Sequence, residues 1–321
     1  MRAEPEAAAD RGAAEGSGDR EAGVPRAGIQ ESLTAALVAN VVVSGVLTGL
    51  VYGLMALGLS VIFGVVRVVN FAHGEMMTIA MFAATVLFSA LHLDPFLAML
   101  PVAAAFFVFG YVLQAAVINP FITRPEHSQF MLLVAIAIIL VNSMLMIFGP
   151  DARSVQVDYQ LESYEIGPLL VDKARLMAAG AAIVAAAALF AFFKYSLTGK
   201  AIRACADNYL GAKIVGLNVK HLYALTFGLG AMCVAIAGCA MVVLVDVTPP
   251  LGPAYTLLAF VIVIVGGLGS MGGALLGGVL IGVSEALAGL FIDPSAKSMF
   301  SFGLLILVLL LRPQGLLGRR T

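Results

Sequence analysis

Two apolar runs in this chain are longer than a membrane is thick. They cover residues 33–66 and 255–291, which are 34 and 37 residues long. At ~1.5 Å of rise per residue, a straight helix of either length would overshoot a hydrocarbon core of ~30 Å by a wide margin. The sequence therefore predicts that each run is a broken or re-entrant helix.

The whole chain carries about eight apolar segments, at residues 33–66, 72–92, 96–118, 129–149, 176–194, 221–245, 255–291 and 298–312. Charged residues make up only 12% of the sequence, and the mean hydropathy is +1.02. An average soluble domain carries roughly 25% charged residues. We therefore expect an all-α, polytopic membrane protein. The formal net charge of −1 gives no support for nucleic-acid binding.

Residues 1–30 differ in composition from residues 31–321, which hold the membrane domain. The first 30 residues are rich in Ala, Gly, Glu and Arg and contain no apolar run. This composition predicts a disordered tail that is retained, because a signal peptide would need an apolar stretch beside a basic start.

Basic residues in short loops indicate which side of the membrane each loop faces. The loop 195–220 carries four Lys or Arg residues, whereas the connection 149–175 holds five acidic residues against three basic ones. We therefore expect the loop in the cytoplasm and the connection outside. The C-terminus, with Arg312, and the N-terminal tail are expected in the cytoplasm.

A polar stretch follows the first long run. It places an amide, an imidazole and a carboxylate at Asn70, His73 and Glu75. A charge at membrane depth costs roughly 2.5–3.5 kcal/mol on insertion scales, so such groups normally line a water-filled path or meet partners in a bundle. The stretch predicts part of a substrate path. An interfacial loop near Arg67 and Asp94 fits the composition equally well.

The second long run contains a glycine-rich stretch at residues 266–273. Its glycines are Gly266, Gly267, Gly269, Gly272 and Gly273. They favour a break that exposes backbone groups, which is tolerated at membrane depth where protein or a cavity satisfies those groups. We expect this break and the break at 70–75 to face one another across the path. The pairing of the two long runs indicates an internal duplication, either inverted or direct.

Residues 196–218 predict a short amphipathic helix along the cytoplasmic surface. Ala201, Cys205 and Ala212 recur at near-helical spacing, and Gly216 would end the helix. The segment is either a docking helix for a soluble partner or a linker whose positive charge keeps it inside.

The sequence offers no motif for catalysis or for a cofactor. A phosphate-binding loop ending at Gly199-Lys200 would need Gly at position 194 and Ser or Thr at position 201, where the chain has Lys194 and Ala201. The three cysteines lack metal-binding spacing, and no nucleophile–base pair is evident. We therefore expect a transport subunit that does not hydrolyse nucleotide itself and carries no cofactor or metal.

Three blocks of sequence together resemble LivH-type permeases, the membrane subunits of branched-chain amino acid ABC importers. The first joins GLVYGLMALGLS at 49–60 to VNFAHGE at 69–75. The second runs from RACADN at 203–208 to GLN at 216–218, and the third from VGGLGS at 265–270 to the glycine pair at 277–278. The blocks agree with that family in order and spacing over about residues 35–315.

The resemblance implies a permease of a bacterial or archaeal inner membrane, surrounded by lipid, that pairs with a second homologous permease or with itself. Two cytoplasmic ATP-binding subunits would dock on the coupling loop, and an extracytoplasmic binding protein would deliver the substrate. We expect the coupling to be carried by Gly199, Arg203, Ala204, Ala206, Asp207 and Gly216.

The substrate stays open, because the family also transports urea, amides and aromatic acids as well as branched-chain amino acids. A secondary transporter or channel without an ATPase would share the broken helices and buried polar groups. A purely structural membrane scaffold is a third class. The 196–218 segment favours the importer, since a self-sufficient carrier needs no docking helix.

Overall fold

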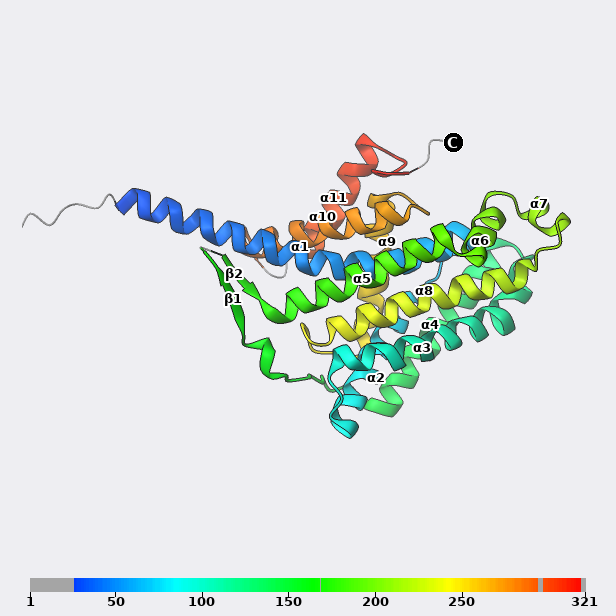
Figure 1. The fold of residues 1–321 in the computed structure, drawn as a ribbon, viewed down its shortest axis with the longest axis horizontal. Helices are drawn as coiled ribbons and strands as arrows, with labels where there is room; N and C mark the ends of the chain where they lie inside the picture. The colour runs from blue at the N-terminus through cyan, green and yellow to red at the C-terminus, as the bar shows by residue number, and fades with distance from the viewer. Residues whose placement is uncertain (1–25, 168, 294–296, 319–321) are drawn as a thin grey trace, which may run out of the picture.

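The computed structural model describes residues 26–167, 169–293 and 297–318 as a bundle of long helices with one two-stranded hairpin (Figure 1). The longer helices are α1 (Arg26–Val66), α2 (His73–Leu91), α3 (Pro95–Val112), α4 (Glu126–Phe148), α5 (Lys173–Tyr195), α8 (Val219–Met241), α9 (Gly252–Gly266), α10 (Met271–Phe291) and α11 (Lys297–Leu311). The shorter elements are the π-helix η1 (Leu113–Ile118), the 3-10 helices η2 (Asn119–Phe121), η3 (Asp158–Gln160) and η4 (Pro249–Leu251), the antiparallel strands β1 (Ser163–Ile166) and β2 (Leu169–Asp172), and the helices α6 (Leu197–Asp207) and α7 (Tyr209–Ile214).

Eight helices of the described ranges are long and apolar enough to cross a membrane. This finding confirms the polytopic, all-α class. The predicted break in the run 255–291 is also confirmed, because α9 ends at Gly266 and α10 begins at Met271.

The first long run is not broken, contrary to the prediction. Helix α1 continues over 41 residues, or ~61 Å at ~1.5 Å per residue, and extends past the hairpin in Figure 1. Gly45, Gly49 and Gly53 do not interrupt it, because they serve close packing against α10: a Cβ added to Gly49 would lie 2.7 Å from the carbonyl oxygen of Gly278. The break comes after Val66, where Arg67 adopts a φ of 58°.

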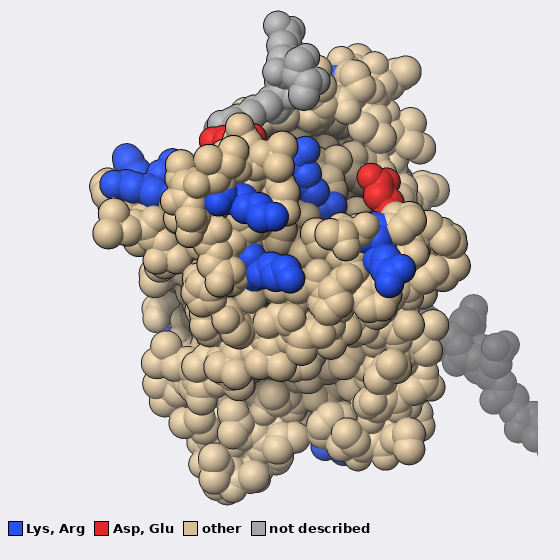
Figure 2. Space-filling model, turned by 90° about the vertical axis from the view of Figure 1, so that its right-hand side faces the viewer, with Lys and Arg blue, Asp and Glu red and all other residues tan. Residues whose placement is uncertain are grey.

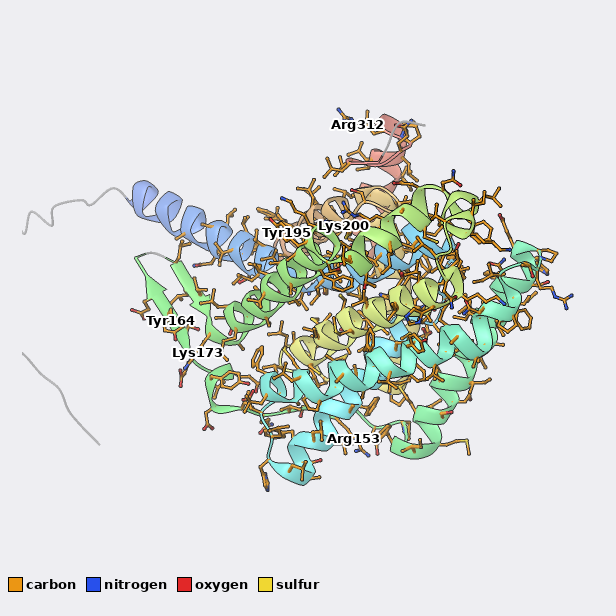
Figure 3. All side chains as sticks on the ribbon, turned by 45° about the vertical axis from the view of Figure 1, so that its right-hand side comes forward. Arg153, Tyr164, Lys173, Tyr195, Lys200 and Arg312 are labelled. Atoms are coloured by element: carbon orange, nitrogen blue, oxygen red, sulfur yellow. The ribbon has the colours of Figure 1, made fainter. Side chains whose placement is uncertain are left out.

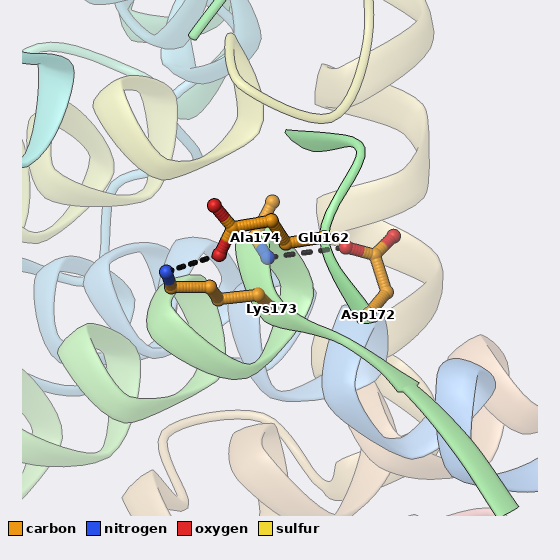
Figure 4. Close-up of polar contacts among 4 residues, drawn as sticks. All are labelled: Glu162, Asp172, Lys173 and Ala174. Atoms are coloured by element: carbon orange, nitrogen blue, oxygen red, sulfur yellow. Dashed lines mark hydrogen bonds and ion pairs between the residues drawn. The ribbon is translucent and has the colours of Figure 1, made fainter. Parts of the chain in front are cut away.

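The bundle has a hairpin end and an α6 end, which lie opposite one another in Figure 1. At the hairpin end, the backbone N–H of Leu170 donates to the Asn40 side chain of α1 over 2.8 Å. The ammonium of Lys173 pairs there with Glu162, and Asp172 caps α5 (Figure 4). Figure 3 labels Lys173 beside the strands, and Lys200, which belongs to α6, away from them.

Two groups of three helices thread the bundle in opposite directions. Helix α1 runs from the hairpin end to the α6 end, whereas α8 starts after α7 and runs back. Its far end lies near the hairpin, because the side chain of Gln160, just before the hairpin, donates to the Val243 carbonyl over 2.6 Å. In each group the first helix, α1 or α8, is followed by α2 or α9 and then by α3 or α10. Helix α10 packs on α1 and α3 packs on α8, where Gly110 and Gly228 allow close contact. The two groups are therefore arranged in opposite directions, as an inverted duplication would require.

Helices α1 and α8 occupy the centre of the bundle, and the outer helices present apolar side chains outward. Met146 on α4 is 88% exposed and Leu310 on α11 is 80% exposed. Large exposed apolar faces are unfavourable in water, so these helices provide the surface that lipid covers.

Candidate functional site

The polar stretch after α1 is buried inside the bundle, at the start of α2. Asn70 and His73 have no exposed surface and Glu75 is 3% exposed. The interfacial-loop interpretation therefore does not hold. The chain turns back after Val66, and His73 reaches the Met55 carbonyl of α1, eleven residues before the end of that helix.

Helix α2 begins directly against the start of α9. The backbone N–H of Gly74 donates to the Thr256 hydroxyl over 2.9 Å, and this hydroxyl donates to the Glu75 carboxylate, also over 2.9 Å. A Cβ added to Gly74 would lie 2.1 Å from the Gly252 carbonyl oxygen, so no larger residue fits. We call Gly74, Glu75, Gly252 and Thr256 the α2–α9 clasp. Glu75 lies in the first turn of α2, where the helix dipole favours an acidic side chain.

His73 and Asn70 hold the re-entrant turn that leads into the clasp. The carbonyl of Met55 can only accept, so the His73 Nε2 carries the hydrogen of their 2.9 Å bond. Among the described residues, Nδ1 of His73 has no hydrogen-bond partner. The Asn70 side chain accepts from the Ala72 N–H over 3.1 Å and so fixes the turn.

Gly252 and Thr256 were not predicted from the sequence, although a signal was present. The spacing Val-x4-Gly-x3-Thr occurs at residues 69–78 and again at residues 247–256. In both copies the glycine lies in the clasp, and the inverted threading brings the two copies together. Repeated spacing at the starts of α2 and α9 would have pointed to the partner of Glu75.

The glycine-rich stretch forms a tight turn between α9 and α10 at the α6 end. Gly267 and Gly269 adopt φ angles of 107° and 76°, which favour glycine. The Ser270 hydroxyl caps α10 by accepting from the Gly273 N–H over 3.1 Å. Gly266 and Gly273 touch through their backbones, since a Cβ on Gly266 would lie 2.1 Å from the Gly273 oxygen. Gly272 is exposed and makes no such contact.

Both breaks contribute to one cavity of about 1680 Å³ at the α6 end, lined by residues that include 67–69 and 268–271. Gly269 and Gly64 meet at its wall, where a Cβ on either would lie 3.3 Å from the other's Cα. Gly269 lines the cavity, whereas Asn70, His73 and Glu75 lie behind its wall. Its ionisable lining residues are Arg67, Glu126, His127, Lys200, Arg203 and Asp207.

The segment 196–218 forms two helices, α6 and α7, and not the single predicted helix. The chain bends at Asn208, which has an extended backbone (φ −145°, ψ 95°) and whose side chain caps α7 by accepting from the Gly211 N–H over 2.8 Å. A capping Asn competes with helix continuation, which explains the interruption. Gly216 follows α7 with a φ of 85°, as its predicted role at a helix end requires.

Among the residues expected to couple the chain to a partner, some pack α6 against the bundle and others are exposed. Gly199 is buried, and a Cβ there would lie 2.4 Å from the Phe192 oxygen of α5. Arg203, Ala204 and Asp207 are exposed and line the cavity, as does the half-buried Ala206.

The two helices also combine a packed inner face with an apolar outer face. Cys205 lies on the buried face of α6, and this burial raises the pKa of its thiol. Leu210, Ile214 and Val215 remain exposed, at 66%, 84% and 75%. Figure 2 views this end of the molecule and shows several Lys and Arg side chains with few Asp or Glu. The surface is therefore basic with apolar side chains among the charges.

Comparison with known proteins places the chain among transport permeases. The family model described as branched-chain amino acid transport system / permease component matches residues 41–309. The chain is 32% identical over 290 residues to the high-affinity branched-chain amino acid transport system permease protein LivH of Escherichia coli (strain K12), covering 86% of this chain and 94% of that protein. It is 29% identical over 290 residues, with the same coverage, to the corresponding protein BraD of Pseudomonas aeruginosa. No solved structure matches the chain at a comparable level of significance.

Proposed function

The chain belongs to the branched-chain amino acid transport system permease family, and from this premise we propose that it is the membrane subunit of an ATP-driven importer in a bacterial or archaeal inner membrane. The observation that carries the proposal is the α6–α7 surface, which combines exposed apolar and basic side chains beside a cavity bounded by both chain breaks. An exposed apolar patch among charged side chains marks an interaction site, and we assign it to a soluble partner.

The proposed assembly contains two ATP-binding subunits, a second permease and an extracytoplasmic binding protein. The second permease is a homologue or another copy of this chain. The ATP-binding subunits would contact α6 and α7, where Arg203, Ala204 and Asp207 are exposed. Their ATP cycle would shift the permease between two states, because a partner moves an equilibrium only by binding one state better than the other.

The orientation follows from the basic α6 end, which we place in the cytoplasm. The hairpin, with exposed Glu162 and Glu165, then faces outside. Because Asn40 of α1 contacts Leu170 of the hairpin, the described start of α1 would also lie outside. This orientation differs from the cytoplasmic position expected for the N-terminal tail, of which residues 1–25 lie outside the described residues.

We place the substrate path along the two breaks. Its inner part is the cavity lined by Gly269, and its middle lies at Asn70, His73 and Glu75, with Gly266, Gly267, Gly272 and Gly273 shaping the turn. The clasp closes the middle of the path in the described conformation, because the Thr256 hydroxyl is hydrogen-bonded to the Glu75 carboxylate. Branched-chain amino acids are the substrates named for the relatives, and we propose this class for the chain.

The coupling proposal is tested by Ala206→Trp, which places a bulky side chain on the cavity wall of α6. We expect uptake per ATP hydrolysed to fall roughly tenfold in vesicles that hold the full complex, because the bulky side chain disturbs the contact through which α6 follows its partner. The matched control is Ala188→Trp, because Ala188 is exposed on α5 away from the cavity. Equal coupling in both variants would contradict the role of α6.

Co-purification separates the importer from its alternative. After mild solubilisation we expect an ATP-binding subunit to accompany the chain, and uptake to stop when ATP is depleted. A chain that purifies without any ATPase and transports in depleted vesicles is a secondary transporter or channel, and one that supports no uptake is a structural scaffold.

A further inference from the structure

The described end of the chain folds back onto the turn between α9 and α10. The backbone N–H groups of Leu316 and Leu317 donate to the carbonyls of Val265 and Gly266, each over 2.9 Å. Those carbonyls belong to the last turn of α9 and have no partner within that helix. We call residues 312–318 the C-terminal strap.

The strap fits the turn only because glycines meet there. Gly315 has a φ of 78°, and a Cβ on it would lie 2.6 Å from both the N and the Cα of Gly267. A Cβ on Gly267 would in turn lie 2.4 Å from the N of Gly318. The two backbones therefore approach too closely for any larger residue, and the contact depends on Gly267 and Gly315 together.

The strap also forms one wall of the cavity at the α6 end. Pro313, Gln314 and Leu317 line this cavity, and so do Lys200 and Arg203 of α6. A partner that fills the cavity from the α6 side therefore touches the strap as well. The turn that the strap holds contains Gly269, which rests against Gly64 at the end of α1.

From these contacts we infer that the C-terminal strap is a lock on the inner end of the path. It holds the α9–α10 turn against α1 in the described state, and it is released when α6 and the cavity rearrange. The contacts are suited to release, because they are two backbone hydrogen bonds and glycine contacts beside an open cavity. The inference rests on the proposed transport function, since a lock needs a path to close.

A labelling experiment tests the lock without measuring transport. Val265, in the last turn of α9, has no exposed surface, and its carbonyl accepts from the strap, so Val265→Cys reports whether the turn is open. The reporter is placed in the full chain with Cys205, Cys233 and Cys239 replaced by Ser, and a membrane-impermeant maleimide is added to inside-out vesicles. The variant that releases the strap is Gly315→Val, because its side chain collides with Gly267.

The matched control is Gly303→Val, which makes the same chemical change on α11, where an added Cβ meets nothing within 4 Å. We expect Gly315→Val to raise the labelling rate at position 265 about fivefold or more over this control, because two hydrogen bonds of the strap are lost. Equal labelling in the two variants would overturn the lock.

A truncation after Arg312 keeps the inference testable where Gly315→Val fails to fold. It removes the strap without adding any bulk, and we expect the same rise in labelling at Val265→Cys. A complete complex that contains the truncated chain should also show reduced uptake while its ATP-binding subunits still hydrolyse ATP. Unchanged labelling and uptake after truncation would also overturn the lock. Failure of the unmodified complex to take up amino acids would instead count against the proposed function.

Discussion

The two ends of α9 are fixed by different kinds of contact. At its start, the Thr256 hydroxyl is buried between Gly74 and Glu75, and the backbones of Gly74 and Gly252 leave no room for a side chain. At its end, two carbonyls accept from the strap beside an open cavity. Breaking the start exposes buried polar groups inside the bundle, whereas breaking the end lets water replace the lost bonds. The start therefore anchors the fold, and the end is the place where movement costs least.

The largest expected effect comes from filling the contact at the start of α9. Gly74→Val adds a side chain whose Cβ would lie 2.1 Å from the Gly252 oxygen and 2.4 Å from the Thr256 nitrogen. Both near atoms are backbone, so α2 and α9 must separate, and we expect a loss of about 3 kcal/mol or more. Yield of folded protein and thermal stability in detergent measure this loss.

The control for this substitution is Gly180→Val, because Gly180 is exposed on α5 with nothing within 4 Å of an added Cβ. It should fold normally. Normal yield and stability of Gly74→Val itself would show that the clasp is not the anchor, and the difference between the two ends of α9 would disappear.

A smaller effect is expected from removing the hydroxyl of the clasp. Thr256→Val keeps the size of the side chain but leaves the Gly74 N–H and the Glu75 carboxylate without this partner. Hydrogen bonds between membrane helices contribute about 0.6 kcal/mol on average and ~1.7 kcal/mol at most, so two lost bonds predict a decrease of about 1–2 kcal/mol. Thermal unfolding in detergent gives the value.

Thr226→Val is the matched control, since Thr226 is equally buried but bonds only the Leu222 carbonyl of its own helix. We expect Thr226→Val to change stability by less than half as much as Thr256→Val. Equal losses of stability in the two variants would mean that the hydrogen bond between helices stabilises the protein no more than a bond within one helix. Only the glycine contact of the clasp would then stabilise it.

The contrast between the two ends also explains what the sequence could and could not predict. Apolar length and the glycines at 266–273 predicted the broken second run, because a helix cannot pass through residues with the φ angles of Gly267 and Gly269. The same length argument was wrong for α1. A helix that extends past the hairpin satisfies its own backbone over its whole length, and Gly49 serves packing on α10.

Which residues meet within the site depends on how the helices are arranged in space, and local sequence patterns do not contain that arrangement. From the sequence, the charge of Glu75 was expected to be costly at membrane depth and to face the 266–273 stretch. Its hydroxyl partner is instead Thr256, near the other end of α9. Only the inverted arrangement of α1–α3 and α8–α10 brings the starts of α2 and α9 together. The roles of Asn70 and His73 in transport stay a prediction.

The smallest effect is expected at the end of α9, where neighbouring glycines of one turn provide their own control. Gly267→Ala introduces a Cβ 2.4 Å from the strap at Gly318 and strains a φ of 107°, whereas the nearest atom to a Cβ on Gly272 is 4.0 Å away. The strap can move into the open cavity, so Gly267→Ala should lower stability by only about 1 kcal/mol, and Gly272→Ala should be close to neutral. Thermal unfolding of the pair measures the difference. If Gly267→Ala instead matched the loss seen for Gly74→Val, the end of α9 would be as rigid as its start, and the inner turn could not be the element that moves.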